Sequence, residues 1–309
     1  MKKKLWLSAT ILCVVSAVMV SCSMDEESGI SAIKNREVKF SSDIITVDTD
    51  PKVKMGGNSW HEDDEIGVYM LDDAAMSIVE SKGNIPFTAQ TDGSTGTFVA
   101  QDQKIYFPDD SKDVRFMAYY PYQATLTDEI YKVDVSDQRE LSKIDLLYSF
   151  EGDAIYNKSD SGKEIPLVFE HQLTNLIINI KPGGGLVEGD LSELDVYLSG
   201  FNTLADFDLM SKSLANPSVI ATITPVEITP NSGYTDSYEA IILPVAEVPE
   251  GAKIVFDLQN GNLFTWNFDK ALETSTRYVY NVTINRSEII VEATINDWTN
   301  GGSTDVDAE

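Results

Sequence analysis

The chain has 309 residues and a formal net charge of −27 at pH 7, with 50 acidic residues against 23 basic ones. A field of this sign repels nucleic acids and anionic membrane surfaces, which excludes both as main partners. The two cysteines are Cys13 and Cys22. The chain beyond them therefore holds no disulfide, no thiol nucleophile and no cysteine-ligated metal site.

The first predicted element is a secretory signal at residues 1–21. A basic start at residues 2–4 precedes an apolar run from Leu5 to Val20, and Ser21 stands before Cys22. This order is typical of a lipoprotein signal, which a peptidase cleaves before the cysteine so that Cys22 is acylated. Acyl chains contribute about 0.8 kcal/mol per buried methylene and anchor the protein to a membrane. The alternative is a transmembrane helix, for which the run is too short because a span needs about 20 apolar residues.

Residues 22–36 are predicted to form a flexible acidic tether. The segment begins Ser-Met-Asp-Glu-Glu-Ser directly after Cys22. Acidic residues in this place resemble an export signal that sends lipoproteins to the outer face of the cell. The alternative is an ordinary solvated spacer.

Beyond the tether, short runs rich in Val, Ile, Tyr, Phe and Thr alternate with clusters of Gly, Pro, Asn and Asp. This pattern predicts many short strands joined by turns, and the sequence shows no long apolar period of 3.6 residues. We therefore expect few and short helices. The predicted strands are Glu37–Phe40, Glu65–Met70, Lys104–Phe107, Val114–Tyr119, Ile130–Val135, Leu173–Ile180, Leu194–Leu198, Val219–Ile223, Tyr238–Leu243, Lys253–Gln259, Asn262–Phe268, Tyr278–Ile284 and Ile289–Ile295.

The clearest hairpin joins residues 253–259 to residues 262–268 through Asn260-Gly261. Type I′ turns prefer this dipeptide because both central residues take positive φ. In that register Val255 faces Trp266. The two C-terminal strands form a second hairpin around Arg286-Ser287.

The many short strands predict an all-β fold of two tandem β-sandwich domains. The polar, turn-rich stretch Tyr156–Lys163 favours a boundary that gives domains at residues 37–160 and 161–300, followed by a polar tail at residues 301–309. An alternative break lies at Lys181–Gly185. Two domains of this size fit the usual length range better than one.

The sequence contains no catalytic motif that stands out. His61 lies beside four carboxylates in a predicted turn, where a solvated loop is favoured over a metal site. His171 follows Phe169 on a predicted strand, where a hydrogen-bonded structural role is favoured over that of a general base. Trp60, Trp266 and Trp298 fall at strand positions, which favours burial in the core over an exposed sugar-stacking platform. We therefore expect no metal, no cofactor and no enzymatic activity.

Several motifs in order resemble those of the fimbrillin-like proteins of Bacteroides and Porphyromonas relatives. The resemblance covers about residues 37–300. It rests on Asn58-Ser-Trp60, Asp64-Glu-Ile-Gly-Val-Tyr-Met70, Arg115-Phe-Met-Ala-Tyr-Tyr-Pro121, Asp145-Leu-Leu-Tyr148, Leu167-Val-Phe-Glu-His171, Ala240-Ile-Ile-Leu-Pro244, Tyr278-Val-Tyr-Asn-Val-Thr-Ile284 and Ala293-Thr-Ile-Asn-Asp-Trp298.

The resemblance implies a type V pilus subunit with two sandwiches of Greek-key, transthyretin-like type. Such a subunit is exported as a lipoprotein precursor, and a trypsin-like protease then removes an N-terminal segment. The groove that opens accepts a strand from a neighbouring subunit, a process called donor-strand complementation.

Arg36 and Lys54 are the candidate processing sites, and the sequence slightly favours Arg36. A cut at Arg36 releases little apolar strand material, whereas a cut at Lys54 also releases a complete apolar strand within residues 37–50. The tail after Trp298 is too polar to fill a groove. Unless residues 288–295 swing out, the subunit accepts a strand without donating one, which favours a tip, accessory or anchor position.

The predicted function is that of a cell-surface fimbrial subunit. Its expected partners are other pilus subunits, the outer membrane through the lipid on Cys22, a maturation protease, and a host or bacterial surface ligand. One alternative is a surface glycan-binding lipoprotein of a polysaccharide-uptake system, which would expose a platform of aromatic side chains. A second is a secreted hydrolase, which would need two carboxylates about 5–9.5 Å apart in a cleft.

Overall fold

The computed structural model describes residues 36–44 and 59–298. Within these ranges the fold is all-β, as the sequence predicts, and its only helices are three short 3₁₀ turns, η1 (Leu141–Lys143), η2 (Lys158–Asp160) and η3 (Glu188–Leu191). The strands are β1 (Lys39–Ile44), β2 (Glu65–Asp72), β3 (Ile85–Ala89), β4 (Thr95–Ala100), β5 (Val114–Tyr120), β6 (Ile130–Asp134), β7 (Leu147–Phe150), β8 (Glu164–His171), β9 (Thr174–Pro182), β10 (Asp195–Asp208), β11 (Ser213–Ile223), β12 (Val226–Ile228), β13 (Asp236–Ile242), β14 (Lys253–Asp257), β15 (Leu263–Asn267), β16 (Thr276–Ile284) and β17 (Ile289–Asp297).

Seven strands of the N-terminal part pair into a closed barrel in the order β1-β4-β3-β2-β5-β7-β8. The sequence predicts a two-sheet sandwich here, and the observed pairing differs from it at β1. This strand pairs antiparallel with β4 and parallel with β8, so it joins two edges that a sandwich would leave open.

The barrel encloses an aromatic core. Trp60 is buried there, as predicted, and its ring meets Phe98 and Phe169 edge to face at centroid distances of 5.0 and 5.1 Å. Such pairs add about 0.5–1.5 kcal/mol each beyond the burial of their area. The barrel therefore has a complete core of its own.

The C-terminal part contains two five-stranded sheets. One has the order β11-β10-β14-β15, with β6 also paired to β10, and the other has the order β12-β13-β9-β16-β17. Apolar residues from both sheets form one buried cluster, including Leu198 and Phe256 from the first and Ile178 and Val282 from the second. The two sheets therefore share a core.

Strand pairing crosses the boundary that the sequence places at residue 160. β6 lies before that residue but pairs with β10 of the C-terminal part, while β8 lies after it and pairs with β1 and β7 of the barrel. The chain therefore passes from one part to the other between β5 and β6, between β6 and β7, and between β8 and β9. The division into folding units at residues 37–160 and 161–300 stays a prediction.

The hairpin of β14 and β15 forms where the sequence predicts it, but its predicted register is wrong by one residue. Val255 pairs with Thr265 instead of Trp266. The left-handed residues of the turn are Gln259 (φ 57°) and Gly261 (φ 92°), so the loop has three residues between Leu258 and Asn262 and is not a two-residue type I′ turn. The extra loop residue shifts every pair of the ladder.

The second predicted hairpin is confirmed. β16 and β17 pair antiparallel from Ile284 and Ile289 next to the turn outward. β16 also pairs parallel with β9, whereas β17 is the edge of its sheet. The C-terminal strand is thus held to the sheet by main-chain bonds on one side.

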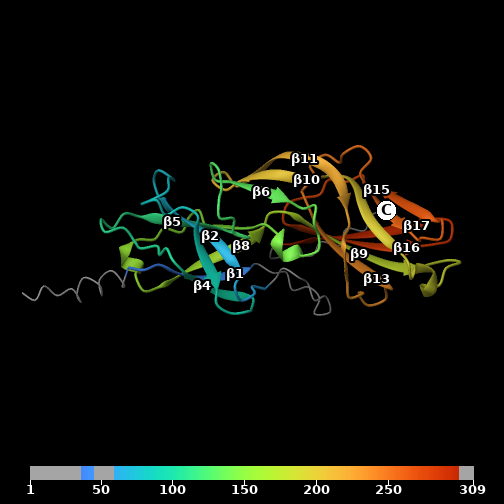
Figure 1. Ribbon diagram of the computed structural model, residues 1–309, viewed down its shortest axis with the longest axis horizontal. Coiled ribbons are helices and arrows are strands. Elements are labelled where there is room, and N and C mark those ends of the chain that lie inside the picture. Colours follow the sequence, from blue (N-terminus) through green and yellow to red (C-terminus); the bar gives the residue numbers. More distant parts are fainter. Residues whose placement is uncertain (1–35, 45–58, 299–309) are drawn as a thin grey trace, which may run out of the picture.

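A third buried cluster joins the barrel to the C-terminal part, and the two parts lie end to end in Figure 1. It combines outward-facing residues of β2 and β5, such as Tyr69 and Met117, with Phe207 of β10, Ile241 of β13 and Trp298. Apolar burial of this kind contributes about 25 cal/mol per Å². The junction is therefore a packed core instead of a flexible linker. In the described ranges, no helix is long and apolar enough to cross a membrane.

Buried tyrosines make the fold sensitive to alkali. Burial raises the pKa of Tyr131 and of Tyr238 from 10.0 to about 12, with nearby carboxylates adding to the shift. Because these folded pKa values exceed the unfolded value, their stabilising contribution is complete below pH 10 and is lost as pH rises from 10 toward about 12. We expect phenolate absorbance and loss of the β-sheet circular dichroism to change together in this window, and Tyr131→Phe to move the transition to higher pH. Tyrosine ionisation near pH 10 without loss of structure would contradict this expectation.

Candidate functional site

Strand β1 fills a slot between β4 and β8 in the wall of the barrel. Its residues alternate, with Phe40, Ser42 and Ile44 buried and Lys39 and Asp43 exposed. The ring of Phe40 is 0% exposed and meets Phe87 and Phe116 edge to face at 5.0 and 5.1 Å. Removal of β1 would therefore empty an apolar slot and leave the facing edges of β4 and β8 without main-chain partners.

Arg36, the first described residue, is held against the barrel. Its guanidinium Nη1 donates to the carbonyl of Phe107 at 3.0 Å and lies 2.7 Å from Asp109 Oδ1, and its side chain is 16% exposed. The Arg36 carbonyl in turn accepts from the Phe107 amide at 3.1 Å. A trypsin-like protease must insert the arginine side chain into its own pocket, so cleavage here needs these contacts to open.

The other two predicted site residues, Cys22 and Lys54, lie outside the described residues. Their places in the sequence still matter for what a cut would do. Arg36 precedes β1, whereas Lys54 lies in the stretch of chain that connects β1 to β2. Cleavage at Arg36 leaves β1 covalently attached to the barrel, and cleavage at Lys54 detaches it.

The end of the C-terminal strand is clamped at the junction. Trp298 is 1% exposed and stacks on His171 with a centroid distance of 3.7 Å and an angle of 8°. The guanidinium carbon of Arg277 lies 5.5 Å from the centre of the Trp298 ring. Nδ1 of His171 lies 2.9 Å from Asp145, which confirms the predicted structural role of this histidine.

Arg277 is linked beside this stack to a second buried ionisable residue, Glu239. Arg277 Nε donates to Asn175 Oδ1 at 2.9 Å, and Asn175 Nδ2 donates to Glu239 Oε1 at 2.8 Å. Burial lowers the pKa of Arg277 and raises the pKa of Glu239, because desolvation disfavours each charged form. The asparagine thus links the two residues across neighbouring strands of one sheet.

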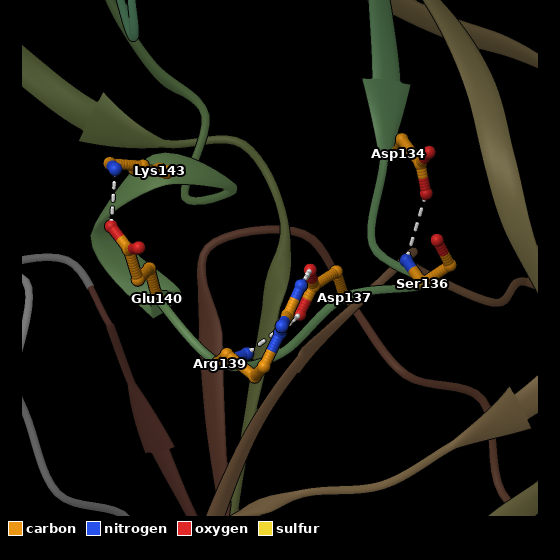
Figure 2. Close-up of polar contacts among 6 residues, drawn as sticks. All are labelled: Asp134, Ser136, Asp137, Arg139, Glu140 and Lys143. Atoms are coloured by element: carbon orange, nitrogen blue, oxygen red, sulfur yellow. Dashed lines mark hydrogen bonds and ion pairs between the residues drawn. The ribbon is translucent and has the colours of Figure 1, made fainter.

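Gln138 ties the loop after β6 to β13. Its Nε2 donates to the carbonyls of Val135 at 2.7 Å and Ile241 at 2.9 Å, while its Oε1 accepts from the Ile241 amide at 2.9 Å. These bonds satisfy a buried backbone amide and carbonyl of β13 that face away from β9. Figure 2 shows exposed polar contacts of the same loop. Ser136 donates a hydrogen bond to Asp134, and ion pairs join Asp137 to Arg139 and Glu140 to Lys143.

The tryptophans and His61 differ in their exposure to solvent. Trp298 and Trp60 are buried and Trp266 is partly buried against Phe268 and Tyr280, so the three do not form an exposed platform. The side chain of His61 is 64% exposed in its turn. Across residues 36–44 and 59–298, no group of three or more histidine, aspartate or glutamate side chains could hold a metal ion.

Sequence reasoning missed Gln138, Arg277 and Glu239. Glu239 lies within a predicted apolar strand, Arg277 directly precedes another, and Gln138 lies in a polar loop that resembles other solvated loops of the chain. The partners of these side chains come from strands distant in the sequence. The sequence offered one signal: Arg277 directly precedes the motif Tyr278–Ile284, and Glu239 directly precedes the motif Ala240–Pro244.

Most of the described fold lies in a region that matches a known protein family. The family model described as fimbrillin-like matches residues 52–298. The chain belongs to the fimbrillin-like family. A Bacteroides uniformis protein described as a fimbrium subunit, Fim1C, is 31% identical over 323 aligned positions that cover all of both chains.

Two solved structures share this fold. A crystal structure from Bacteroides uniformis, described as a cell adhesion protein, is 29% identical with a TM-score of 0.68, covering 85% of this chain and 98% of the other. A second, from Bacteroides ovatus and also described as a cell adhesion protein, has a TM-score of 0.65 at 20% identity, covering 86% and 99%. At that identity the second likeness speaks for the fold alone.

The junction gives a direct test with adjacent residues. Gln138→Leu should lower the free energy of unfolding by about 1–3 kcal/mol, because it leaves the buried amide and carbonyl of Ile241 without partners. Arg139→Leu, one residue later on the exposed surface, should change it by about 0.5 kcal/mol or less. Urea unfolding measures both. If both variants changed the free energy of unfolding equally, the hydrogen bonds of Gln138 would not be what stabilises the junction.

Proposed function

We propose that this chain is a cell-surface subunit of a type V pilus that accepts a strand from a neighbouring subunit after proteolytic removal of β1. The observation that carries the proposal is the position of β1, which closes the barrel between β4 and β8 and lies at the N-terminal end of the described fold. An incoming strand with apolar residues at alternate positions could occupy the same slot.

The slot offers both parts of strand recognition. β1 makes ladders on two sides, with its register running from Phe40↔Phe98 to Asp43↔Thr95 on β4 and from Lys39↔Glu164 to Ile44↔Phe169 on β8. These main-chain groups would supply affinity to any extended peptide. The inward sites of Val38, Phe40 and Ile44 would select its side chains, because a shift of one residue places polar groups in the core.

We further propose that the productive cut falls near Lys54, although the sequence alone slightly favours Arg36. Only a cut after β1 separates the strand from the barrel. The family match supports this choice because it begins at residue 52, so β1 lies outside the matched region. The contacts of Arg36 with Phe107 and Asp109 also disfavour proteolysis there.

The C-terminal end supports a subunit that accepts a strand without donating one. Trp298 is enclosed by His171 and Arg277 at the junction, so release of β17 would break a buried stack. The residues after it are polar and offer only Val306 and Ala308 as apolar side chains. We therefore propose a tip, accessory or anchor position instead of a repeating stalk position.

We also propose that a lipid on Cys22 anchors the precursor to the outer membrane. Export as a lipoprotein with acyl chains on Cys22 would hold the precursor at the outer membrane, facing outward, until a maturation protease cuts it. An anchor subunit would keep that lipid. The alternative of a surface glycan-binding lipoprotein with an aromatic platform gains no support, because Trp60 and Trp298 are core residues. An enzymatic role gains no support from the fimbrial and adhesion relatives.

Limited trypsin digestion of the purified precursor tests this function. We expect a discrete cut at Lys52 or Lys54, after which native mass spectrometry detects the β1 fragment bound without a covalent link. Lys52→Ala/Lys54→Ala should prevent release of the fragment, and Arg36→Ala should not. Electron microscopy should show no long homopolymers, because the contacts of Trp298 hold β17 in its own sheet.

Three outcomes would contradict the proposal. If Arg36→Ala abolished the discrete cut and Lys52→Ala/Lys54→Ala did not, the processing site would be Arg36 and β1 would stay attached to the barrel. If β1 stayed bound after the cut and could not be displaced by any subunit of the fimbria, the barrel would not be an acceptor. Long homopolymers after digestion would assign the chain to the stalk.

A further inference from the structure

An open cavity lies beside the junction core. Its volume is about 310 Å³, and it lies between the loop from β2 to β3 and the loop from β5 to β6. Tyr69, which belongs to the junction core, forms part of its wall. Small-molecule sites occur preferentially where two structural units meet.

The walls of the cavity are fixed by hydrogen bonds between the two loops. Tyr119 Oη donates to Asn84 Oδ1 at 2.7 Å, and Asn84 Nδ2 donates to the carbonyl of Gln123 at 2.9 Å. The carbonyl of Glu129 accepts from the Leu209 amide at 3.1 Å, which fastens the second loop to the end of β10. The cavity is therefore part of the folded framework.

Several residues of the same loops take left-handed backbone conformations. Positive φ angles occur at Glu80, Ser81, Asn84, Asp128 and Glu129, none of which is glycine. Left-handed conformations of such residues persist where the surroundings hold them, and they concentrate at ligand-binding loops. Gly83 lets the loop pack closely against the wall of the cavity. A Cβ there would lie 2.9 Å from Ile78 Cδ1 and 3.2 Å from the Tyr69 ring, so a larger residue would push these side chains away.

The lining has the chemistry of a site for a polyhydroxyl ring. Ser81 and Thr125 contribute hydroxyls, Glu129 contributes the only charge among the lining residues, and Ile78 and Leu126 contribute apolar surface. Burial, and then the charge of Glu129, raise the pKa of Tyr69, so its phenol keeps its proton. The only charged residue in the lining is a carboxylate, which disfavours anionic ligands.

We propose that this cavity binds one neutral hexose unit of a surface glycan. The carboxylate of Glu129 would accept hydrogen bonds from sugar hydroxyls, Ser81 and Thr125 would exchange bonds with others, and the apolar face of the ring would pack on Ile78 and Leu126. A volume of about 310 Å³ accommodates one or two sugar rings. The proposal goes beyond strand exchange and does not depend on it.

Saturation-transfer NMR on the uncut precursor tests this proposal, with the methyl glycosides of glucose, galactose, mannose and N-acetylglucosamine as probes. We expect at least one probe to bind with a millimolar Kd and to shift backbone amides in residues 78–84 and 124–129. Glu129→Gln should weaken binding about tenfold or more, and Thr125→Val about threefold. Glu140→Gln, an exposed carboxylate on the loop after β6, is the matched control and should leave the affinity unchanged.

Other results would overturn the proposal. Absence of binding by all four glycosides would do so, as would binding that Glu129→Gln and Glu140→Gln affect equally. Binding of n-butylamine but of no glycoside, with loss in Glu129→Gln, would assign the cavity to a lysine side chain of a partner protein. None of these results bears on release of β1, because the test is made before cleavage.

Discussion

Main-chain pairing on both sides of β1 is the constraint on which the barrel depends. β4 and β8 each present a row of amides and carbonyls, and β1 satisfies both rows while placing Phe40 among Phe87 and Phe116. An open sheet edge in a secreted protein invites pairing with other chains. Here one short strand protects two edges, and the same geometry makes its removal an efficient way to expose them.

The junction explains how the rest of the molecule could tolerate such a loss. The chain crosses between the two parts three times, and the crossing segments pack into a buried cluster with Tyr69, Phe207 and Trp298. Neither the shared core of the two sheets nor this cluster includes β1. Removing β1 would therefore disturb the barrel core directly and leave the C-terminal sheets in place.

The sequence predicted the local features of the fold better than the long-range ones. Alternation along residues 278–284 and 289–295 predicted a hairpin because both strands lie next to each other in the chain. Barrel closure was missed because it depends on parallel pairing of β1 with β8, which leaves no local pattern. The turn-rich stretch at 156–163 predicted a boundary, whereas Tyr156 bridges Val114 within the barrel part.

For the candidate sites, too, the sequence predicted local features and missed long-range contacts. Arg36 could be found as a basic residue beside a predicted strand, but only the fold shows that it is held by Phe107 and Asp109. His171 was recognised as structural, while its stack with Trp298 joins two motifs far apart in the sequence. The register of β14 and β15 failed for a smaller reason, since Asn260-Gly261 did not reveal that Gln259 also belongs to the turn.

Peptide exchange tests the central claim most directly, namely that β1 is a replaceable strand. After trypsin digestion, the protein is mixed with a labelled synthetic peptide of residues 37–50, or with the same peptide carrying Phe40→Asp. The account predicts that the native peptide displaces the β1 fragment and restores the thermal stability of the uncut protein, and that the altered peptide does neither. A digested protein that is equally stable without β1, or that binds both peptides alike, would contradict it.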